Sequence, residues 1–192
     1  TEEFLAQLDL AVAERSPERA ATRRAFAAAN SWTDRYQRID SALRGAAKLA
    51  SVVVVTYNNL PLTQLCLESL LRNTDGLNLE VIVVDNASSD GTPAYLRYME
   101  TAHPEVRVIL NAENQGFPRA NNQALAIARG DYLVLLNNDT VVPRGWLPRL
   151  VRHLDDEQVG LAGPVTNFVG NEAKVEATYR SWAEMQQFAD DR

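Results

Sequence analysis

The chain has 192 residues, of which 46% are hydrophobic and 23% are charged, a composition typical of a globular protein and not of a disordered one. Its 25 acidic residues outnumber its 19 lysines and arginines, giving a net charge of −6 at pH 7. Surfaces that bind nucleic acid or anionic membranes concentrate positive charge, so this balance argues against both as general partners. The single cysteine excludes an intrachain disulfide and fits a reducing compartment, and no apolar run is long enough to span a bilayer.

Residues 1–49 differ from the rest of the chain and are predicted to form a helical N-terminal segment. Ser16 and Pro17 are the residue types of a helix cap and a first helical turn, which predicts a helix through about Ala29. A further helix is predicted from apolar residues that recur on one helical face, namely Trp32, Tyr36, Ile39 and Leu43. Gly45 suits the end of that helix. No group of residues in this segment indicates chemistry.

From Ala50 onwards, apolar runs of strand length alternate with helical patterns. The predicted strands are residues 51–56, 80–84, 106–110 and 131–136. The predicted helices are residues 61–71, 92–102, 119–129 and 145–154, and Gly130 suits the end of the third. This alternation predicts an α/β fold, with a parallel sheet and helices on both faces, in which the first and fourth strands are buried.

Three of the predicted strands end in a short polar segment. Residues 56–59 follow the first strand, residues 85–92 the second and residues 137–140 the fourth. In open α/β sheets, ligands bind beyond the carboxyl ends of the strands, at the point where the strand order reverses. If the order is 3-2-1-4, these three strands are neighbours and their polar segments share one rim. The sequence therefore predicts a substrate pocket at this edge of the sheet.

Several kinds of site find little support. Neither a dinucleotide-binding glycine pattern nor a P-loop pattern is present, and the two histidines stand apart from any cysteine. Ser88 and Ser89 have no nearby histidine in the sequence, so a nucleophilic triad is disfavoured. The segments 85–92 and 137–140 would also suit a plain turn or a helix cap, and that alternative stays open.

Asp139 is the most informative single residue. It is a carboxylate among amides, at the mouth of an apolar strand and without a basic neighbour in the sequence. Mg²⁺ and Mn²⁺ are often held by only one or two carboxylates, with substrate phosphates and waters completing the coordination. Such an ion would let an acidic rim bind a diphosphate, and it would offset the charge on a departing nucleoside diphosphate.

Five segments in order, SVVVVTYNN, VIVVDNASSDGT, NQGFPRANNQAL, GDYLVLLNNDTVV and GPVTNFVGNEA, resemble family 2 glycosyltransferases of the GT-A fold. The similarity is to the bacterial rhamnosyltransferase-like members in particular, and it runs from about Ala50 to the C-terminus. It implies a Rossmann-like, mostly parallel sheet. It also implies the inverting transfer of a sugar from a nucleotide-diphosphate donor to an acceptor hydroxyl, in bacterial polysaccharide or glycan synthesis.

The resemblance also implies site residues. The segment NNDT corresponds to the metal motif of the family, so Asp139 and Asn137 are the expected ligands of Mg²⁺ or Mn²⁺. Asn137 stands where the family has a first acidic residue. The expected nucleotide-binding residues are Thr56, Tyr57, Asn58, Asp85, Asn86, Asn121 and Asn138. Asn121 falls where many relatives place an arginine.

The catalytic base of the family is an acidic residue well downstream of the metal motif, and the sequence up to Arg192 contains no matching segment. Glu172, Asp190 and Asp191 do not fit that motif. General-base help is worth about 10²–10⁴-fold in rate, so we expect this chain alone to be inactive or weakly active. We expect the base beyond Arg192, and a division into a helical segment, 1–49, and a partial GT-A nucleotide-sugar-binding domain, 50–192, without its acceptor part.

The expected partners are a nucleotide-diphosphate sugar, a glycan or lipid-linked acceptor, and further domains of a longer chain, with no nucleic acid. The expected location is the cytoplasm, with peripheral attachment to the inner face of a bacterial membrane as a further option. One alternative is a non-catalytic nucleotide- or carbohydrate-binding module of a larger protein. Another is a receiver-like regulator with Asp85 as phosphoacceptor, but that class needs an acidic pair where this chain has TYNN.

Overall fold

A computed structural model describes residues 2–13, 16–33, 35–37, 39, 48–74, 77–167, 170 and 172–191. The chain divides into two units, residues 1–46 and residues 47–192, which are treated separately below. The predicted boundary between the helical segment and the α/β domain lies at residues 49 and 50. None of the described helices is both long and apolar enough to cross a membrane.

The first unit is helical. It contains α1 (Glu2–Ala13) and α2 (Pro17–Ala29). Ser16 caps α2, its hydroxyl accepting a hydrogen bond from the Arg19 backbone N–H at 3.4 Å, as its position before Pro17 predicts. Of the predicted third helix, residues 32–33, 35–37 and 39 are helical, whereas Leu43 and Gly45 lie outside the described residues.

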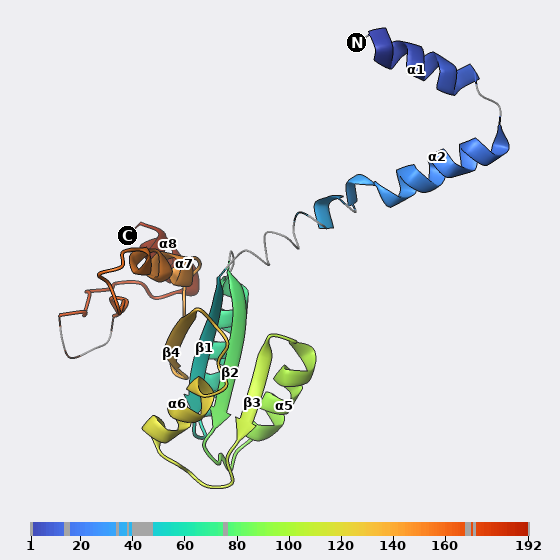
Figure 1. The fold of residues 1–192 in the computed structure, drawn as a ribbon. Helices are drawn as coiled ribbons and strands as arrows, with labels where there is room; N and C mark the ends of the chain where they lie inside the picture. Colours follow the sequence, from blue (N-terminus) through green and yellow to red (C-terminus); the bar gives the residue numbers. More distant parts are fainter. Residues whose placement is uncertain are drawn as a thin grey trace. The chain divides into compact units, whose positions relative to one another are not determined.

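The second unit is built on four parallel strands, shown in Figure 1. They are β1 (Leu49–Thr56), β2 (Asn78–Asp85), β3 (Val106–Leu110) and β4 (Tyr132–Asn137), in the order β3-β2-β1-β4. The predicted order 3-2-1-4 is confirmed, and β1, β2 and β4 are neighbours. In register, Thr56 lies opposite Asp85 on one side, and Val55 lies opposite Asn137 on the other. The three polar segments therefore leave the sheet at the same edge.

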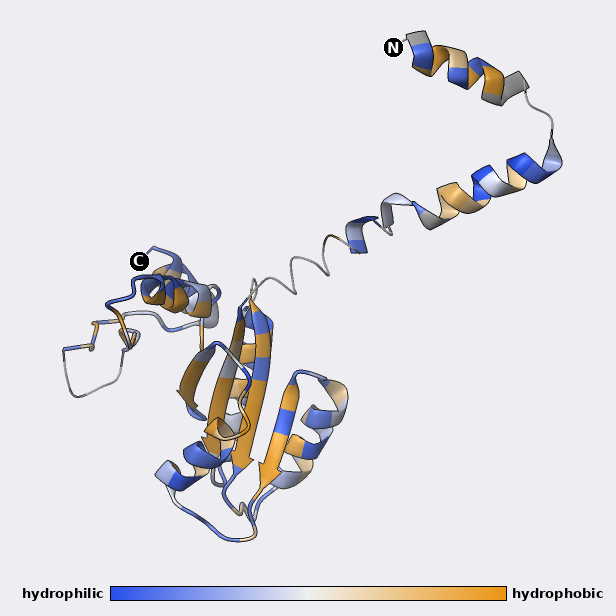
Figure 2. Cartoon of the chain, in the orientation of Figure 1, coloured by the Kyte–Doolittle hydropathy of each residue, from blue (hydrophilic) through white to orange (hydrophobic). Residues whose placement is uncertain are grey.

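Helices cover both faces of this sheet. The second unit contains α4 (Leu60–Asn73), α5 (Thr92–Ala102), α6 (Phe117–Leu125), α7 (Trp146–Val151), the 3₁₀ helix η1 (Arg152–Asp155) and α8 (Trp182–Asp190). Side chains from α4, α5 and α7 pack on one face of the sheet, and α6 packs on the other through Ala120 and Ala124. Figure 2 shows the apolar strands between helices of mixed hydropathy. The predicted layered arrangement is confirmed.

The third predicted helix is shorter than expected. The sequence predicted residues 119–129, but α6 begins at Phe117 and ends at Leu125. Pro118 suits the first turn, which accounts for the earlier start. At the other end, the backbone N–H of Arg129 donates to Glu80 and that of Gly130 donates to Ser51, so the chain must leave the helix to reach β4.

The expectation that the fourth strand, β4, is buried is wrong. Leu133 and Leu135 are 57% and 55% exposed. The reason is topological, because β4 pairs only with β1 among the described strands, and α6 covers β1 and β2. An edge strand can therefore carry an apolar sequence and still be half exposed.

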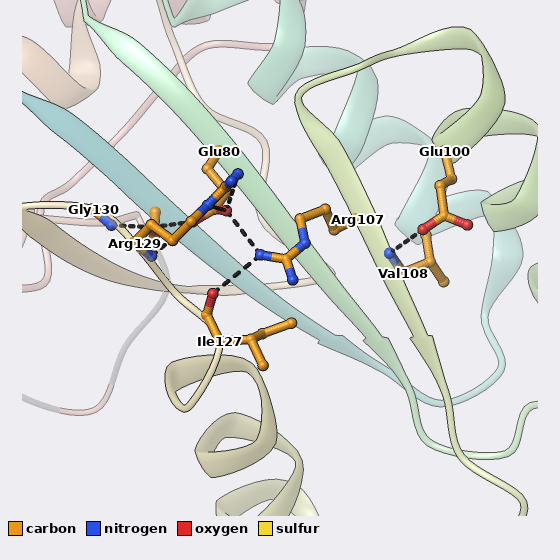
Figure 3. A network of polar contacts seen from close by, with 8 residues as sticks. Glu80, Glu100, Arg107, Val108, Ile127, Arg129 and Gly130 are labelled. Atoms are coloured by element: carbon orange, nitrogen blue, oxygen red, sulfur yellow. Dashed lines mark hydrogen bonds and ion pairs between the residues drawn. The ribbon is translucent and has the colours of Figure 1, made fainter.

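One buried carboxylate, Glu80 of β2, joins the strands at the edge opposite their carboxyl ends (Figure 3). Its Oε2 accepts hydrogen bonds from the Ser51 hydroxyl at 2.6 Å and from the Arg129 backbone N–H at 3.0 Å. Its Oε1 accepts from Arg107 Nη1 at 3.0 Å and from Arg129 Nε at 2.8 Å. Arg107 also donates to the Ile127 carbonyl at 3.1 Å. The cluster thus connects β1, β2, β3 and the residues that lead into β4.

Gly130 lets the chain approach this cluster. A Cβ at this position would lie 2.5 Å from the Ser51 backbone nitrogen and 2.9 Å from the Leu49 carbonyl oxygen. Any other residue would therefore push β4 away from β1. The glycine that the sequence suggested as a helix end serves instead as a point of close contact between strands.

The hydrogen bonds of this cluster dominate the ionisation of Glu80. Burial by itself raises the pKa of the carboxyl group. Hydrogen bonds from Ser51, the Arg129 backbone and the Arg107 and Arg129 guanidinium groups outweigh burial, and they lower the pKa from 4.5 to about 2. A shift of that size corresponds to about 3 kcal/mol of stability at neutral pH.

Replacing Glu80 with glutamine should therefore lower the free energy of unfolding by about 2–4 kcal/mol at pH 7. Since the folded pKa lies below 4.5, the contribution of the carboxylate is present above about pH 4.5 and is lost as the pH falls through about 2. The difference between wild type and Glu80→Gln should be constant from pH 7 to about 5 and should fall by roughly half at pH 3. Urea unfolding across this pH range measures it.

Glu68→Gln is the matched control, because Glu68 is an exposed glutamate of the same unit, on α4. That variant should unfold like wild type at every pH. A Glu80→Gln difference that stayed constant down to pH 3 would contradict the assignment of the stability to the ionised carboxylate.

Candidate functional site

A cavity of about 410 Å³ lies at the edge of the sheet to which the carboxyl ends of the strands point. The residues that line it are Val55, Thr56, Tyr57, Asn86, Asn114, Gly116, Phe117, Asn137, Asn138 and Asp139. They come from the ends of β1, β2 and β4 and from the loop between β3 and α6. Six of the nine residues expected from the sequence are among them, and Asn58, Asp85 and Asn121 are not.

The turn after β1 is held in a tight conformation. Asn58 and Asn59 both have left-handed backbone angles, with φ of 57° and 66°, which asparagine tolerates better than most residues. The Asn58 backbone N–H donates to the Ser88 hydroxyl at 2.6 Å, and its side-chain Oδ1 accepts from the Ser89 N–H at 2.8 Å. Asn58 thereby joins two loops of the rim, and Tyr57, which is 54% exposed, lines the cavity.

Asp85, at the end of β2, is only 2% exposed. Its Oδ2 accepts a hydrogen bond from the Ser88 N–H at 3.1 Å, while Oδ1 is buried and has no partner among the described residues. A buried polar atom without a partner is costly, and most such atoms in native proteins are satisfied by a protein group, by water or by a ligand. Asp85 therefore offers one acceptor atom close behind the rim.

Asn86 organises the loop between β3 and α6. Its Nδ2 donates to Asn114 Oδ1 at 2.8 Å, and its Oδ1 accepts from Asn111 Nδ2 at 3.1 Å and from the Gln115 N–H at 2.9 Å. Asn111 and Gln123 of α6 exchange two further hydrogen bonds, of 2.9 and 3.0 Å. This amide network fixes the loop that closes one side of the cavity.

The same loop ends in an unusual backbone conformation. Gly116 has φ 76° and ψ 160°, a region that is essentially restricted to glycine. Phe117 follows as the first residue of α6, and this residue is 53% exposed and lines the cavity. Asn121, by contrast, is 6% exposed and donates to the Phe117 carbonyl at 2.8 Å, so its side chain bonds to the backbone of the first turn of its own helix.

The segment after β4 forms a turn in which the Thr140 N–H donates to the Asn137 carbonyl at 3.2 Å. Asn138 Nδ2 donates to the hydroxyls of Thr56, at 3.2 Å, and Thr63, at 3.1 Å. The Asp139 carboxylate is exposed at the cavity, and among the described residues no hydrogen bond or ion pair holds it. Asp139 is therefore available to a ligand.

The thiol of Cys66 lies beneath this turn and donates to the Asn137 carbonyl at 3.4 Å. Burial, with a smaller contribution from the nearby Asp139 carboxylate, raises the pKa of the Cys66 thiol to about 12. The thiol is therefore an inert, protonated group at neutral pH and not a nucleophile.

The oxygen donors at the rim suit a hard divalent ion. Within the part of the chain that the structure describes, no three residues among histidines, cysteines, aspartates and glutamates come together as a metal-binding group. One carboxylate, Asp139, beside the amide of Asn137 does fit the way in which Mg²⁺ or Mn²⁺ is bound when phosphates and waters complete its coordination.

The acidic residues near the C-terminus lie away from the cavity lining. Glu172 is exposed in a turn. Asp190 accepts a hydrogen bond from Gln186 at 3.1 Å, and Asp191 accepts one from Gln187 at 2.8 Å, so both belong to the end of α8. Asp139 is the only carboxylate among the described residues that line the cavity.

Besides Val55 of β1, three lining residues were not expected from the sequence, namely Asn114, Gly116 and Phe117. They follow β3, which lies at the edge of the sheet, so the order 3-2-1-4 gave no reason to place them at the rim. The signal that could have found them is the polar segment 111–116, which is as rich in amides as the segments after the other three strands. After β3 the chain leads into α6, which packs on β1 and β2, and this brings the segment to the cavity.

The Rossmann-like parallel sheet, the helices on both of its faces and the polar cavity at the carboxyl ends of the strands are those of a GT-A domain, the fold that the sequence resemblance implied. Residues 51–191 match the sequence profile of glycosyl transferase family 2, and the chain belongs to that family. It is 31% identical over 138 residues to the glycosyltransferase AglE of Haloferax volcanii, an alignment that covers 71% of this chain and 45% of that protein. It is 34% identical over 103 residues to the succinoglycan biosynthesis protein ExoO of Rhizobium meliloti, covering 54% of this chain and 29% of that one.

Solved structures agree with this assignment. The mannosyltransferase PcManGT from Pyrobaculum calidifontis, in complex with GDP-Man and Mn²⁺, matches with a TM-score of 0.54 and 36% identity, over 58% of this chain and 33% of that chain. TarS from S. aureus in complex with UDP matches with a TM-score of 0.50 and 27% identity, over 57% of this chain and 32% of that chain. The chain spans less than half the length of each of these relatives.

The backbone conformation at Gly116 leads to a prediction. A Cβ at Gly116 would meet no atom within 4 Å, so Gly116→Ala adds no clash and tests the positive φ alone. We expect it to cost about 1–3 kcal/mol in the free energy of unfolding, with faster amide hydrogen exchange in residues 111–117. Urea unfolding and exchange followed by mass spectrometry measure the two effects.

Gly160→Ala is a matched control, because a Cβ there would also meet nothing within 4 Å and Gly160 is not among the glycines with positive φ. It should change stability by less than about 0.5 kcal/mol. Equal stabilities for the two variants would show that the loop adapts without strain.

Proposed function

We propose that this chain is the donor-binding domain of a glycosyltransferase, which binds a nucleotide-diphosphate sugar through a divalent metal ion for inverting transfer to an acceptor hydroxyl. The observation that carries the proposal is one cavity, at the carboxyl ends of parallel strands, that is lined by both Tyr57 and Asp139, whose carboxylate has no partner among the described residues. An aromatic ring suits a nucleobase, and a carboxylate suits the ion that accompanies a diphosphate.

The nucleoside end of the donor is assigned to the first part of the rim. Tyr57 offers a half-exposed ring, and the buried Oδ1 of Asp85 is an acceptor without a partner among the described residues. Thr56 and Asn86 also line the cavity. A ligand hydroxyl or N–H that reached Asp85 would satisfy an atom that is otherwise costly to bury.

The diphosphate end is assigned to the turn after β4. Asp139 and Asn137 would hold the metal ion through their side-chain oxygens, and Asn138 lines the cavity beside them. When bound, the ion would neutralise charge on the diphosphate as it leaves. Asn138 has its amide nitrogen engaged with Thr56 and Thr63, so only its carbonyl oxygen is assigned to the ligand side.

The named relatives support this proposal. PcManGT was solved with GDP-Man and Mn²⁺ and TarS with UDP, so proteins of similar fold bind such donors. ExoO is named for succinoglycan biosynthesis, which supports a role in bacterial polysaccharide synthesis. The acceptor that we propose is a glycan or a lipid-linked glycan, at the inner face of the membrane.

A second candidate function is a non-catalytic nucleotide- or carbohydrate-binding module. The observation that favours it is that Asp139 is the only carboxylate in the described cavity lining, which leaves no second acid to take the proton from an acceptor hydroxyl. The two candidates share the donor site and differ in turnover. Release of nucleoside diphosphate from a sugar donor, measured with and without candidate acceptors, separates them.

Asp139→Asn tests the metal site with almost no change in side-chain shape. We expect the affinity for UDP, dTDP or GDP measured with Mn²⁺ to fall by about tenfold or more, because the one carboxylate that the described cavity lining offers to the ion is lost. The affinity measured in EDTA should stay the same. Isothermal titration of each nucleotide, with and without Mn²⁺, gives both values.

Asp155→Asn serves as the control, since Asp155 is an exposed aspartate of η1 outside the cavity lining. An Asp139→Asn protein that kept the full gain in affinity from Mn²⁺ would refute the proposed metal site. A wild-type protein that bound no nucleotide under either condition would refute the proposed function as a whole.

Asn137→Asp tests the same site in the opposite direction. It adds a second carboxylate to the proposed pair, and affinity for hard cations rises with the number of charged ligands. We expect Mn²⁺ to bind several-fold more tightly in the presence of nucleotide, as followed by titration of the ion into the nucleotide complex. Weaker Mn²⁺ binding in this variant would exclude Asn137 from the coordination of the ion.

A further inference from the structure

The helix α4 is unusual because the side it turns to the protein interior carries polar residues. Four of them lie three or four positions apart, on one helical face: Thr63, Cys66, Ser69 and Asn73. Their exposed fractions are 0%, 0%, 3% and 2%. We call this set the α4 polar face. Buried polar groups are unfavourable unless they are hydrogen-bonded, so their partners decide what the face does.

All four residues bond to one segment, residues 137–142. The Thr63 hydroxyl accepts from Asn138 Nδ2 at 3.1 Å. The Cys66 thiol donates to the Asn137 carbonyl at 3.4 Å. At the far end of the segment, the Ser69 hydroxyl accepts from the Val142 N–H at 3.2 Å, and Asn73 Nδ2 donates to the Val142 carbonyl at 2.8 Å. The α4 polar face thus binds both ends of the turn that contains Asp139.

Asp139 itself contrasts with its neighbours. Its carboxylate is exposed at the cavity and has no hydrogen bond or ion pair among the described residues. The turn is held before it at Asn138, through Thr56 and Thr63, and three residues after it at Val142, through Ser69 and Asn73. The place of the carboxylate is therefore set by the backbone of the turn and not by contacts of its own.

We propose that the α4 polar face positions the turn 137–142, so that Thr63, Cys66, Ser69 and Asn73 are positioning residues for the carboxylate of Asp139. The consequence for metal binding rests on the function proposed above, whereas the positioning of the turn does not. Thr63 is the centre of the arrangement, since its hydroxyl also lies 2.8 Å from that of Thr56 and so joins α4, β1 and the turn.

Thr63→Val is the most direct test, because valine keeps the shape of threonine and removes the hydroxyl. We expect amide hydrogen exchange in residues 138–142 to become at least threefold faster relative to exchange in β1 and β2. Thr63→Ser, which keeps the hydroxyl, should restore slow exchange. Thr101→Val is the control, because the Thr101 hydroxyl donates only to the Arg97 carbonyl of its own helix, α5.

The second measurement uses Mn²⁺ and UDP, dTDP or GDP. We expect Thr63→Val to weaken the affinity measured with Mn²⁺ by about threefold to tenfold, and to leave the affinity measured in EDTA unchanged. Thr63→Ser and Thr101→Val should behave like wild type in both conditions. If Thr63 served stability alone, Thr63→Val would lower the melting temperature and leave the gain in nucleotide affinity from Mn²⁺ unchanged.

Cys66→Ala provides an independent test if Thr63→Val does not fold, because it removes a different donor to the same turn. Like Thr63→Val, it should speed amide hydrogen exchange in residues 138–142 and weaken the nucleotide affinity measured with Mn²⁺. Exchange in residues 138–142 that is unchanged in the folded variants, relative to β1 and β2, would overturn the proposal. If the wild type binds no nucleotide, the function proposed above fails, while the exchange experiment still decides whether α4 positions the turn.

Discussion

The central place of β1 in a parallel sheet is the constraint on which the rest of the structure depends. Residues 52–55 of this strand are four valines, each at most 8% exposed, so it can only lie between two neighbours and two layers of helices. Parallel pairing to β2 and β4 then places Asp85 beside Thr56 and Asn137 beside Val55. The polar segments meet because the strand between them is too apolar to lie anywhere else.

The two edges of this sheet use their charged groups in opposite ways. At the edge where the strands begin, Glu80 has both oxygens bonded and two arginines beside it, so its charge stabilises the fold. At the edge where the strands end, the Asp139 carboxylate and one oxygen of Asp85 lack partners among the described residues. The groups that stabilise the fold and the proposed ligand site are thus separated along the strands, and a change at one edge need not alter the other.

Much of the fold follows from local patterns in the sequence, since valine runs, proline at helix starts and polar strand ends indicate the elements and the rim. What could not be predicted depends on distant residues or on side-chain direction. Glu80 bonds to Arg107 and Arg129, which lie 27 and 49 positions away in the sequence. The early end of α6 depends on the same distant contact, between Arg129 and Glu80. The exposure of β4 follows from its edge position, which a strand sequence does not reveal. An asparagine in a motif shows an amide but not its direction, and the side chains of Asn58 and Asn121 prove to bond to backbone groups of the protein, the Ser89 N–H and the Phe117 carbonyl.

The polar face of α4 also accounts for how a site with one carboxylate could work. Mg²⁺ and Mn²⁺ demand near-octahedral geometry with short bonds, so a ligand displaced by a fraction of an ångström loses much of its contribution. Where two carboxylates are present, one can compensate for a displacement of the other. Here Asp139 has no such partner in the described cavity lining, and its own side chain is not held. A site of this kind depends on how precisely its backbone is positioned. The buried hydroxyl, thiol and amide groups of α4 supply that accuracy, and this gives a reason for polar residues at core positions that would otherwise be apolar.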